Sequence, residues 1–540
     1  MREDQPVVVE KLFQSAHRAM SQNQPLVARH HLEQALAIDS KQAKIWHLLA
    51  DSHLATQDLA GGISILETAL CRHNFTPVER ISLQIHLASL YIRADDLGAA
   101  SQCIDLKAVI NLKNPTLAAR AGYLLAICEE HSAALAAFET ALPLQPKDTE
   151  LLFNTASTNR AMGNLETAES MYNRALKLAP DNYPAYWLRS TLRKQTEESN
   201  HIPELEVLAS ASATPAEGKV HLYYALAKEL EDLKLYEESF SALIKGAELK
   251  KNSLGYSVEP DLIAVEEIRK TYSPDTIADK VNSSNQNGEG LIFILGMPRT
   301  GSTLVDRILS SNEQVDSAGE PDTFAQIFYR AAMQTARIRD FISDSQLRAI
   351  RGSIQLDFEK IGQDYQQKLT SRAKQKNSRY IIDKNPSNFL YLGAIKLALP
   401  HAKIIHIKRN PMDTCYAIFK TLFKNGHPYS YDLHDLAAYY SAYDQLMNHW
   451  KSIFGAGYFE LNYEDLVTTP VETSKALMQY CDLNWSENCL EFHKNRVKGT
   501  ATASAAQVRQ PIYRNSLELW KNCEKGLTPL RSLLKEKGLI

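Results

Sequence analysis

The chain has 540 residues, and its 60 lysines and arginines nearly balance its 63 aspartates and glutamates. This balance excludes a strong overall attraction to nucleic acid or to an anionic membrane surface, so any anion-binding site must be local. The 7 cysteines are scattered and include no Cys-x-x-Cys pair, which argues against a disulfide framework and against a zinc site.

The N-terminus, Met-Arg-Glu-Asp-Gln-Pro, is polar and lacks the apolar core of a signal peptide. No run approaches the roughly 18 apolar residues that a membrane span needs. We therefore expect a cytoplasmic protein that binds neither nucleic acid nor a membrane. We also expect no metal, because no two histidines have the spacing of a ligand pair on one helical face.

The N-terminal half repeats itself at a fixed interval. The motif Phe-Glu-Thr-Ala-Leu at 138–142 recurs 34 residues later as Tyr-Asn-Arg-Ala-Leu, and Leu-Glu-Gln-Ala-Leu at 32–36 recurs after the same interval as Leu-Glu-Thr-Ala-Leu. This is the period of the tetratricopeptide repeat, a helical hairpin that stacks into a solenoid. Generic amphipathic helices are the alternative, but they do not account for an interval that occurs twice.

We predict an all-α tetratricopeptide-repeat solenoid over residues 1–255. Solenoids present a concave surface, so we expect this half to bind a protein or peptide partner, or a second copy of the chain in a homodimer. Residues 256–289 lose the pattern and end in a polar, glycine-containing stretch, which predicts a linker or connecting segment. The second domain is then predicted to cover residues 290–540.

The second domain opens with five apolar residues at 291–295, which predict a strand buried on both faces, as in a parallel sheet. An amphipathic helix follows. The segment between them, Gly-Met-Pro-Arg-Thr-Gly-Ser-Thr at 296–303, has the spacing of a phosphate-binding P-loop, but Ser302 replaces the loop lysine. An ordinary strand-to-helix turn is the alternative. With Arg299 as its cation, such a loop suits an anion less charged than a triphosphate.

This loop resembles the 5′-phosphosulfate loop of sulfotransferases that use 3′-phosphoadenosine 5′-phosphosulfate (PAPS). The resemblance is to tyrosylprotein sulfotransferases and to bacterial sulfotransferases with tetratricopeptide repeats. It implies an α/β P-loop-like domain in which helices flank a parallel sheet. It also implies that the loop binds the co-substrate PAPS through Pro298, Arg299, Thr300, Gly301, Ser302 and Thr303.

Two further segments supply candidate catalytic residues. Val-Asp-Ser-Ala-Gly-Glu at 315–320 predicts a short strand that ends near Glu320. Its spacing from Arg299 matches the catalytic glutamate of the family, so the resemblance assigns Glu320 as general base. Tyr-Ile-Ile-Asp-Lys-Asn-Pro at 380–386 predicts another strand, and the resemblance places Lys384 at the transferring sulfuryl group. Together with Arg299, these residues form the predicted catalytic set.

The other end of the nucleotide has its own candidates. Arg409 is the last residue of a predicted strand at 403–409, and Arg-Asn-Pro-Met-Asp resembles the 3′-phosphate loop of the family. Ala417 stands where the family usually has a serine, which puts affinity for the 3′-phosphate in doubt. The resemblance also places Tyr463 near the nucleotide, and it implies a C-terminal loop over the nucleotide that contains Ser504 and Arg509.

These features predict a PAPS-dependent sulfotransferase that transfers a sulfuryl group to an acceptor hydroxyl, with protein tyrosine suggested by the family. Two alternatives stay open. The first is a non-catalytic repeat scaffold with a degenerate nucleotide-binding domain, and the second is a P-loop kinase, which the missing loop lysine disfavours.

Overall fold

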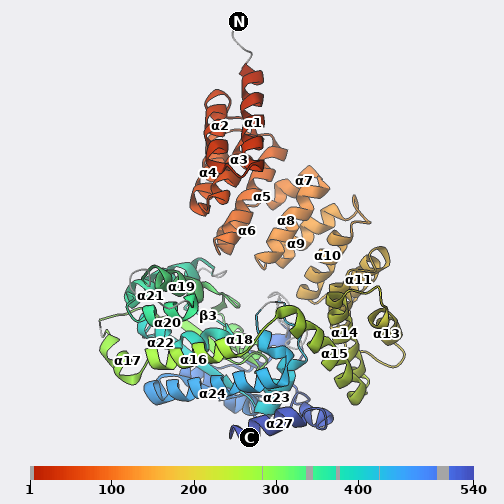
Figure 1. Cartoon of the computed structure of the whole chain (residues 1–540), viewed down its shortest axis with the longest axis vertical. Coiled ribbons are helices and arrows are strands. Elements are labelled where there is room, and N and C mark those ends of the chain that lie inside the picture. The colour runs from red at the N-terminus through yellow and green to blue at the C-terminus, as the bar shows by residue number, and fades with distance from the viewer. Residues whose placement is uncertain (1–4, 283, 336–343, 373–377, 425, 495–509) are drawn as a thin grey trace. The chain divides into compact units, whose positions relative to one another are not determined.

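The structure, a computed structural model, describes residues 5–282, 284–335, 344–372, 378–424, 426–494 and 510–540. Two compact units divide the chain, the first ending at Leu178 and the second beginning at Ala179 (Figure 1). Within the described residues, no helix is both long and apolar enough to cross a membrane.

The first unit consists of stacked helices. The alanines that carry the 34-residue repeat, Ala35, Ala69, Ala141 and Ala175, have no exposed surface, because small residues there let neighbouring helices approach closely. Gly163 ends a helix in the left-handed conformation (φ 87°) at the turn within one hairpin. The helices of this unit are α1 (Gln5–Ser21), α2 (Pro25–Ile38), α3 (Ala43–Ala55), α4 (Leu59–Arg72), α5 (Pro77–Arg93), α6 (Leu97–Gln102), α7 (Leu106–Leu112), α8 (Pro115–Ile127), α9 (His131–Ala141), α10 (Thr149–Met162) and α11 (Leu165–Leu178).

The second unit begins with helices that precede the sheet. They are α12 (Tyr183–Ser190), α13 (Ile202–Ser210), α14 (Ala216–Asp232), α15 (Tyr236–Leu254), α16 (Glu259–Thr271) and α17 (Pro274–Lys280). The segment 256–289, expected as a connection, thus contains two helices, and Tyr272 at the end of α16 hydrogen-bonds through its hydroxyl to Ser353 at 2.8 Å. The boundaries predicted at residues 255 and 290 stay a prediction, while α12–α15 pack within the same compact unit as the sheet.

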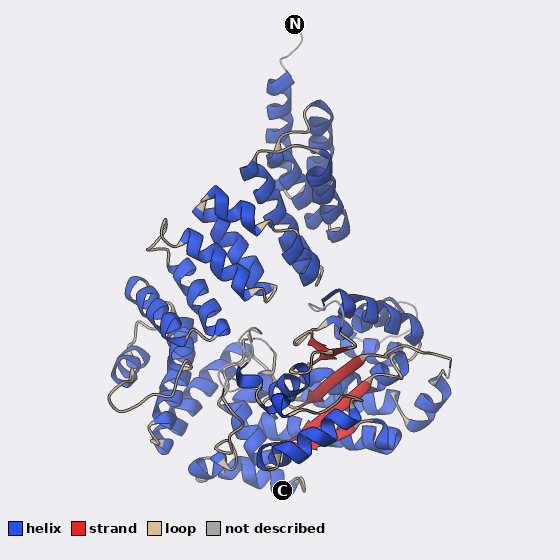
Figure 2. Cartoon of the chain, turned by 180° about the vertical axis from the view of Figure 1, so that it is seen from behind, coloured by secondary structure: helices blue, strands red, loops and turns tan. Residues whose placement is uncertain are grey.

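In the described residues, one sheet of five parallel strands has the order β2-β3-β1-β4-β5 (Figure 2). The strands are β1 (Leu291–Gly296), β2 (Val315–Ser317), β3 (Tyr380–Asp383), β4 (Lys403–Lys408) and β5 (Phe459–Asn462). β1 is buried along its whole length at the centre of the sheet. Strand order reverses between β1 and β4, and ligands of open parallel sheets bind at the carboxyl ends of the strands at such a point.

Helices cover both faces of the sheet. The helices after β1 are α18 (Ser302–Ser310), α19 (Thr323–Thr335), α20 (Ser345–Ser353), α21 (Phe358–Arg372), η2 (Pro386–Tyr391), α22 (Leu392–Ala398), α23 (Pro411–Phe419), η3 (Pro428–Tyr431), α24 (Leu433–Phe454), η4 (Gly455–Gly457), α25 (Tyr463–Thr468), α26 (Pro470–Tyr480), η5 (Glu487–Leu490), η6 (Phe492–Lys494), η8 (Leu519–Cys523) and α27 (Thr528–Glu536).

Side chains alternate between these faces along β1. Ile292 and Ile294 pack in one apolar cluster with α18, α25 and α26. Phe293 points the other way and stacks on Tyr365 of α21 with ring centroids 5.6 Å apart. The predicted fold class, a tetratricopeptide-repeat solenoid followed by an α/β domain with a helix-flanked parallel sheet, is confirmed.

Candidate active site

The loop after β1 has an unusual backbone. Arg299 adopts a positive φ of 66°, rare for a residue with a side chain, and Gly301 has φ 101° immediately before α18 begins. Such strain persists where surrounding structure fixes it, often at functional sites. A Cβ added to Gly301 would lie 2.5 Å from the ring of Tyr463, so glycine is needed there for space as well as for conformation.

Because α18 starts at Ser302, its first N–H groups lack acceptors within the helix and face the loop. Pro298, Thr300, Ser302 and Thr303 are buried, and the Thr300 hydroxyl donates to the Met297 carbonyl at 2.8 Å. The predicted loop residues therefore lie together at the carboxyl end of the central strand, where the helix dipole favours an anion.

Arg409, at the end of β4, lies beside this loop. Its Nη1 donates to the Arg299 carbonyl at 3.0 Å, and its guanidinium lies 4.8 Å from the ring centroid of Tyr463. Burial and the neighbouring charge of Arg409 lower the pKa of Arg299, and the Glu320 carboxylate acts in the opposite direction. Two guanidinium groups, those of Arg299 and Arg409, therefore stand side by side at the loop.

Glu320 and Lys384 form an ion pair. Lys384 Nζ donates to Glu320 Oε1, and the Lys384 side chain is 1% exposed whereas that of Glu320 is 45% exposed. The two residues follow adjacent strands, β2 and β3, and the Lys384 N–H donates to the Gly319 carbonyl at 3.0 Å. The carboxylate thus has a fixed cationic partner and also remains accessible from solvent.

A buried polar network supports Lys384 from the opposite side of the strand. Asp383 has no exposed surface, and it accepts hydrogen bonds from the Tyr365 hydroxyl and from Asn388 Nδ2. Burial raises the pKa of Asp383 to about 7, against these hydrogen bonds, which favour the ionised form. The end of β3 is therefore held firmly where Lys384 leaves the sheet.

Tyr463, predicted near the nucleotide, lies at the start of α25 and contacts both Arg409 and Ser516. Its hydroxyl is 2.7 Å from Ser516 Oγ, and the Ser516 carbonyl accepts from Arg409 Nη2 at 2.6 Å. Ser516 thus ties the C-terminal segment to Arg409, although no motif singles this serine out.

Thr414 does not supply the hydroxyl donor that the alanine at position 417 lacks. Thr414 is fully buried, and its hydroxyl donates to the Arg409 carbonyl at 3.2 Å. Ala417 is itself 9% exposed, so the methyl group fills a packed position. The lower affinity for the 3′-phosphate that Ala417 suggests therefore stays a prediction. The predicted nucleotide-binding residues Ser504 and Arg509 lie outside the described residues.

Two further residues near the site, His427 and Tyr513, were not singled out by the sequence analysis. Burial lowers the pKa of His427 to about 4, and the Glu320 carboxylate acts in the opposite direction, which places this neutral imidazole in the electrostatic field of the candidate base. The Tyr513 hydroxyl lies in the fields of Arg299 and Arg409, which oppose the effect of burial on its pKa. His427 belongs to no recognisable motif, and Tyr513 ends the segment that resembles the family's C-terminal loop without being singled out there, so only the fold reveals where these two side chains lie.

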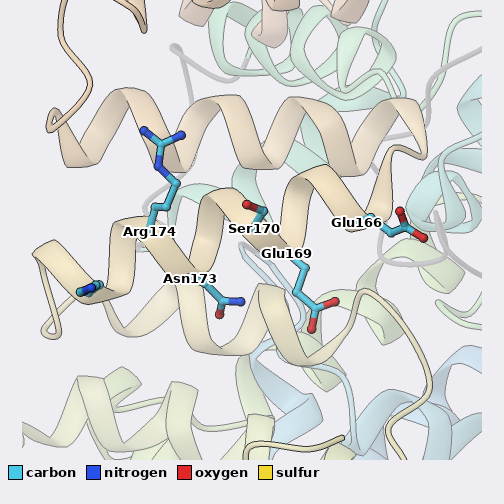
Figure 3. A pocket seen from close by; sticks show the side chains of 6 residues that line it. Glu166, Glu169, Ser170, Asn173 and Arg174 are labelled. Carbon is cyan, nitrogen blue, oxygen red and sulfur yellow. The ribbon is translucent and has the colours of Figure 1, made fainter.

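A surface hollow in the first unit is lined by an ordinary solvated helix face. It runs along α11 and is lined by Glu166, Glu169, Ser170, Asn173, Arg174 and Lys177 (Figure 3). These residues have the spacing of one helical face, and their mixed charges are typical of a solvated surface. Within the described residues, no group of three or more His, Cys, Asp or Glu side chains is placed to hold a metal ion.

Comparison with protein families finds matches for some parts of the chain. Residues 292–487 match the sulfotransferase family, and residues 13–75 and 129–183 match the tetratricopeptide repeat. The chain therefore has a region similar to sulfotransferases, preceded by two regions that match the tetratricopeptide repeat. The matched sulfotransferase region contains Arg299, Glu320, Lys384, Arg409 and Tyr463.

Two individual proteins are also similar to the chain. An uncharacterized protein of Aquifex aeolicus (strain VF5) is 29% identical over 381 residues, which cover 70% of this chain but 49% of that protein. The chain thus spans about half the length of this relative. A putative protein-tyrosine sulfotransferase of Caenorhabditis briggsae is 23% identical over 248 residues, which cover 44% of this chain and 82% of that protein.

Among solved structures, the sulfotransferase domain of the Synechococcus PCC 7002 olefin synthase is similar to 45% of this chain and matches over 96% of its own length. It has 18% sequence identity and a TM-score of 0.30.

Proposed function

We propose that this protein is a PAPS-dependent sulfotransferase that transfers a sulfuryl group to an acceptor hydroxyl. The observation that carries this proposal is the Lys384–Glu320 ion pair near a lysine-free anion loop that contains Arg299 and lies beside Arg409. A sulfuryl group carries less negative charge than a terminal phosphoryl group, so fixed cationic side chains can take the place of the Mg²⁺ that kinases use.

In the proposed reaction, the acceptor oxygen forms a bond to sulfur while the bond between sulfur and the bridging phosphate oxygen breaks. Glu320 takes the hydroxyl proton, and its exposed carboxylate is accessible to an acceptor. Lys384 and Arg299 stabilise the negative charge that grows on the bridging and leaving oxygens. Adenosine 3′,5′-bisphosphate leaves, with Arg409 and Tyr463 proposed at its 3′-phosphate and nucleoside end.

Protein tyrosine is the acceptor to test first, since one relative is named as a putative protein-tyrosine sulfotransferase. We further propose that the repeats bind a protein or peptide, either the acceptor itself or a second copy of this chain.

A thermal-shift experiment tests the donor. We expect adenosine 3′,5′-bisphosphate to raise the Tm, because a ligand that binds only the folded state stabilises it. ATP with Mg²⁺ serves as the comparison, and a shift with ATP alone would favour a kinase. No shift with either nucleotide would favour the scaffold. Transfer of labelled sulfate from PAPS to a tyrosine peptide and to small phenols then tests the acceptor.

A further inference from the structure

Two segments of the chain lie outside both family matches but meet on one helix. Residues 184–291 and 488–540 belong to neither matched region. In the second compact unit, the hairpin of α14 and α15 and the C-terminal elements η8 and α27 all pack against or around α23. This helix begins two residues after Arg409, so whatever fixes α23 also fixes the arginine proposed at the 3′-phosphate.

The hairpin caps the C-terminal end of α23. The last carbonyl groups of a helix lack partners within it, and Tyr224 of α14 supplies one by donating its hydroxyl to the Phe419 carbonyl at 3.2 Å. Tyr224 is 1% exposed, and burial raises its pKa well above the usual value, so the hydroxyl keeps the proton that it donates. Phe240 of α15 packs against Phe419, with ring centroids 6.1 Å apart.

An ion pair strengthens the same junction. Lys420, the residue after α23, lies 2.6 and 3.0 Å from the two carboxylate oxygens of Glu231 in α14. Both side chains are more than three-quarters buried, so solvent screens this pair less than a surface pair. The Lys420 ammonium also lies 4.9 Å from the ring centroid of Tyr416.

The other end of α23 is fixed by the C-terminal segment. Asp413, in its first turn, accepts from the Glu518 N–H at 2.8 Å, and Arg409 donates to the Ser516 carbonyl. The same segment reaches the hairpin, because Cys523 contacts the Tyr416 hydroxyl at 3.2 Å and the Tyr236 carbonyl at 3.9 Å. The nine residues of α23 form a rigid rod about 14 Å long between these two attachments.

We propose that the α14–α15 hairpin is a positioning element of the nucleotide site, although its sequence places it with the repeats. It holds α23 at one end so that Arg409, at the other end, meets the donor in a fixed geometry. The identity of that donor rests on the proposed function. None of these hairpin residues touches the nucleotide in this proposal, and their effect passes through α23.

The test compares two sets of full-length variants. Tyr224→Phe and Glu231→Gln, alone and together, remove the hydroxyl cap and the carboxylate. Glu237→Gln is the matched control, because its ion pair with Lys525 joins the same hairpin to the C-terminal segment but is exposed, with side chains 80% and 93% accessible. Calorimetry measures the Kd of adenosine 3′,5′-bisphosphate, and hydrogen exchange measures the protection of residues 410–419.

We expect the double variant to bind the nucleotide about threefold to tenfold more weakly and to exchange faster at residues 410–414, whereas Glu237→Gln binds like the parent. Exchanging the charges, with Glu231→Lys and Lys420→Glu together, should restore much of the affinity lost by either change alone. Tyr224→Phe removes one oxygen atom and keeps the ring, so it tests the inference even if the charge variants fail to fold.

A lower Tm with unchanged Kd and unchanged exchange at residues 410–414 would overturn the inference, because the hairpin would then only stabilise the fold. If the parent protein binds no adenosine 3′,5′-bisphosphate, the proposed function fails, and hydrogen exchange alone decides the positioning role. Faster exchange at the distant end of α23 would then support that role, and unchanged exchange would refute it.

Discussion

Replacing Glu320 by Gln tests the central ion pair most directly. The change removes the proton acceptor but keeps Oε1 as a hydrogen-bond acceptor for Lys384, so the donor site should survive. We expect kcat to fall at least about 100-fold, which is the lower end of what a positioned general base contributes. That decrease corresponds to about 2.7 kcal/mol of lost transition-state stabilisation.

The same change also has a cost in stability. Lys384 is 1% exposed, and removing one partner of a buried pair costs about 3–5 kcal/mol. Solvent screens the exposed Glu320 carboxylate, since 45% of its side chain is accessible, so we expect about 1–2 kcal/mol instead. The variant should therefore stay folded, with a moderately lower Tm.

Single-turnover transfer of labelled sulfate gives the rate, and calorimetry gives the affinity for adenosine 3′,5′-bisphosphate. Glu313→Gln is the control, because Glu313 is an exposed carboxylate just before β2, the strand that Glu320 follows. An unchanged rate in Glu320→Gln would remove Glu320 from the mechanism. Equal losses of rate in both variants would also refute the reasoning, because they would show a general effect of charge.

Asp383→Asn should flatten the pH dependence of stability. The pKa of Asp383 in the folded parent is raised from 3.8 to about 7, so ionisation of this carboxyl lowers the free energy of unfolding as pH rises across this window. The loss is about 4 kcal/mol in total, and denaturation at several pH values measures it. Gly301→Ala should lower the Tm and weaken nucleotide binding, because the new Cβ meets the Tyr463 ring at 2.5 Å with φ at 101°; unaffected binding would contradict this. Arg409→Ala should raise the Kd of adenosine 3′,5′-bisphosphate with a smaller effect on kcat, and intact affinity by calorimetry would exclude its role at the 3′-phosphate.

Much of the fold follows from local patterns. The 34-residue interval predicts the stacked helices because each hairpin buries its alanines against the next. The apolar run at 291–295 predicts the central strand because only a strand covered on both faces can bury every residue. The ends of two further strands are equally readable, since β3 ends at Asp383 and β4 ends at Lys408, the first charged residue after each apolar run.

Contacts between segments far apart in the chain could not be predicted from the sequence. Ser516 lies 107 residues from Arg409, and Tyr224 lies 195 residues from Phe419. Neither Ser516 nor Tyr224 stands in a motif, and a serine or tyrosine in a helical or polar segment has no signal of its own. The pairing depends on how helices pack, which one sequence without related sequences does not reveal.

The sequence by itself therefore determined the repeat, the parallel α/β domain and the candidate chemistry of its loop, because these are written in the spacing of apolar, small and charged residues along the chain. Only the tertiary structure decided that Lys384 and Glu320 form an ion pair and that Arg409 is held between the loop and the C-terminal segment. It also decided that α14 and α15 pack on the helix that follows Arg409. The physical reason is that side-chain contacts are fixed by the packing of whole elements, whereas the elements themselves are fixed by local periodicity.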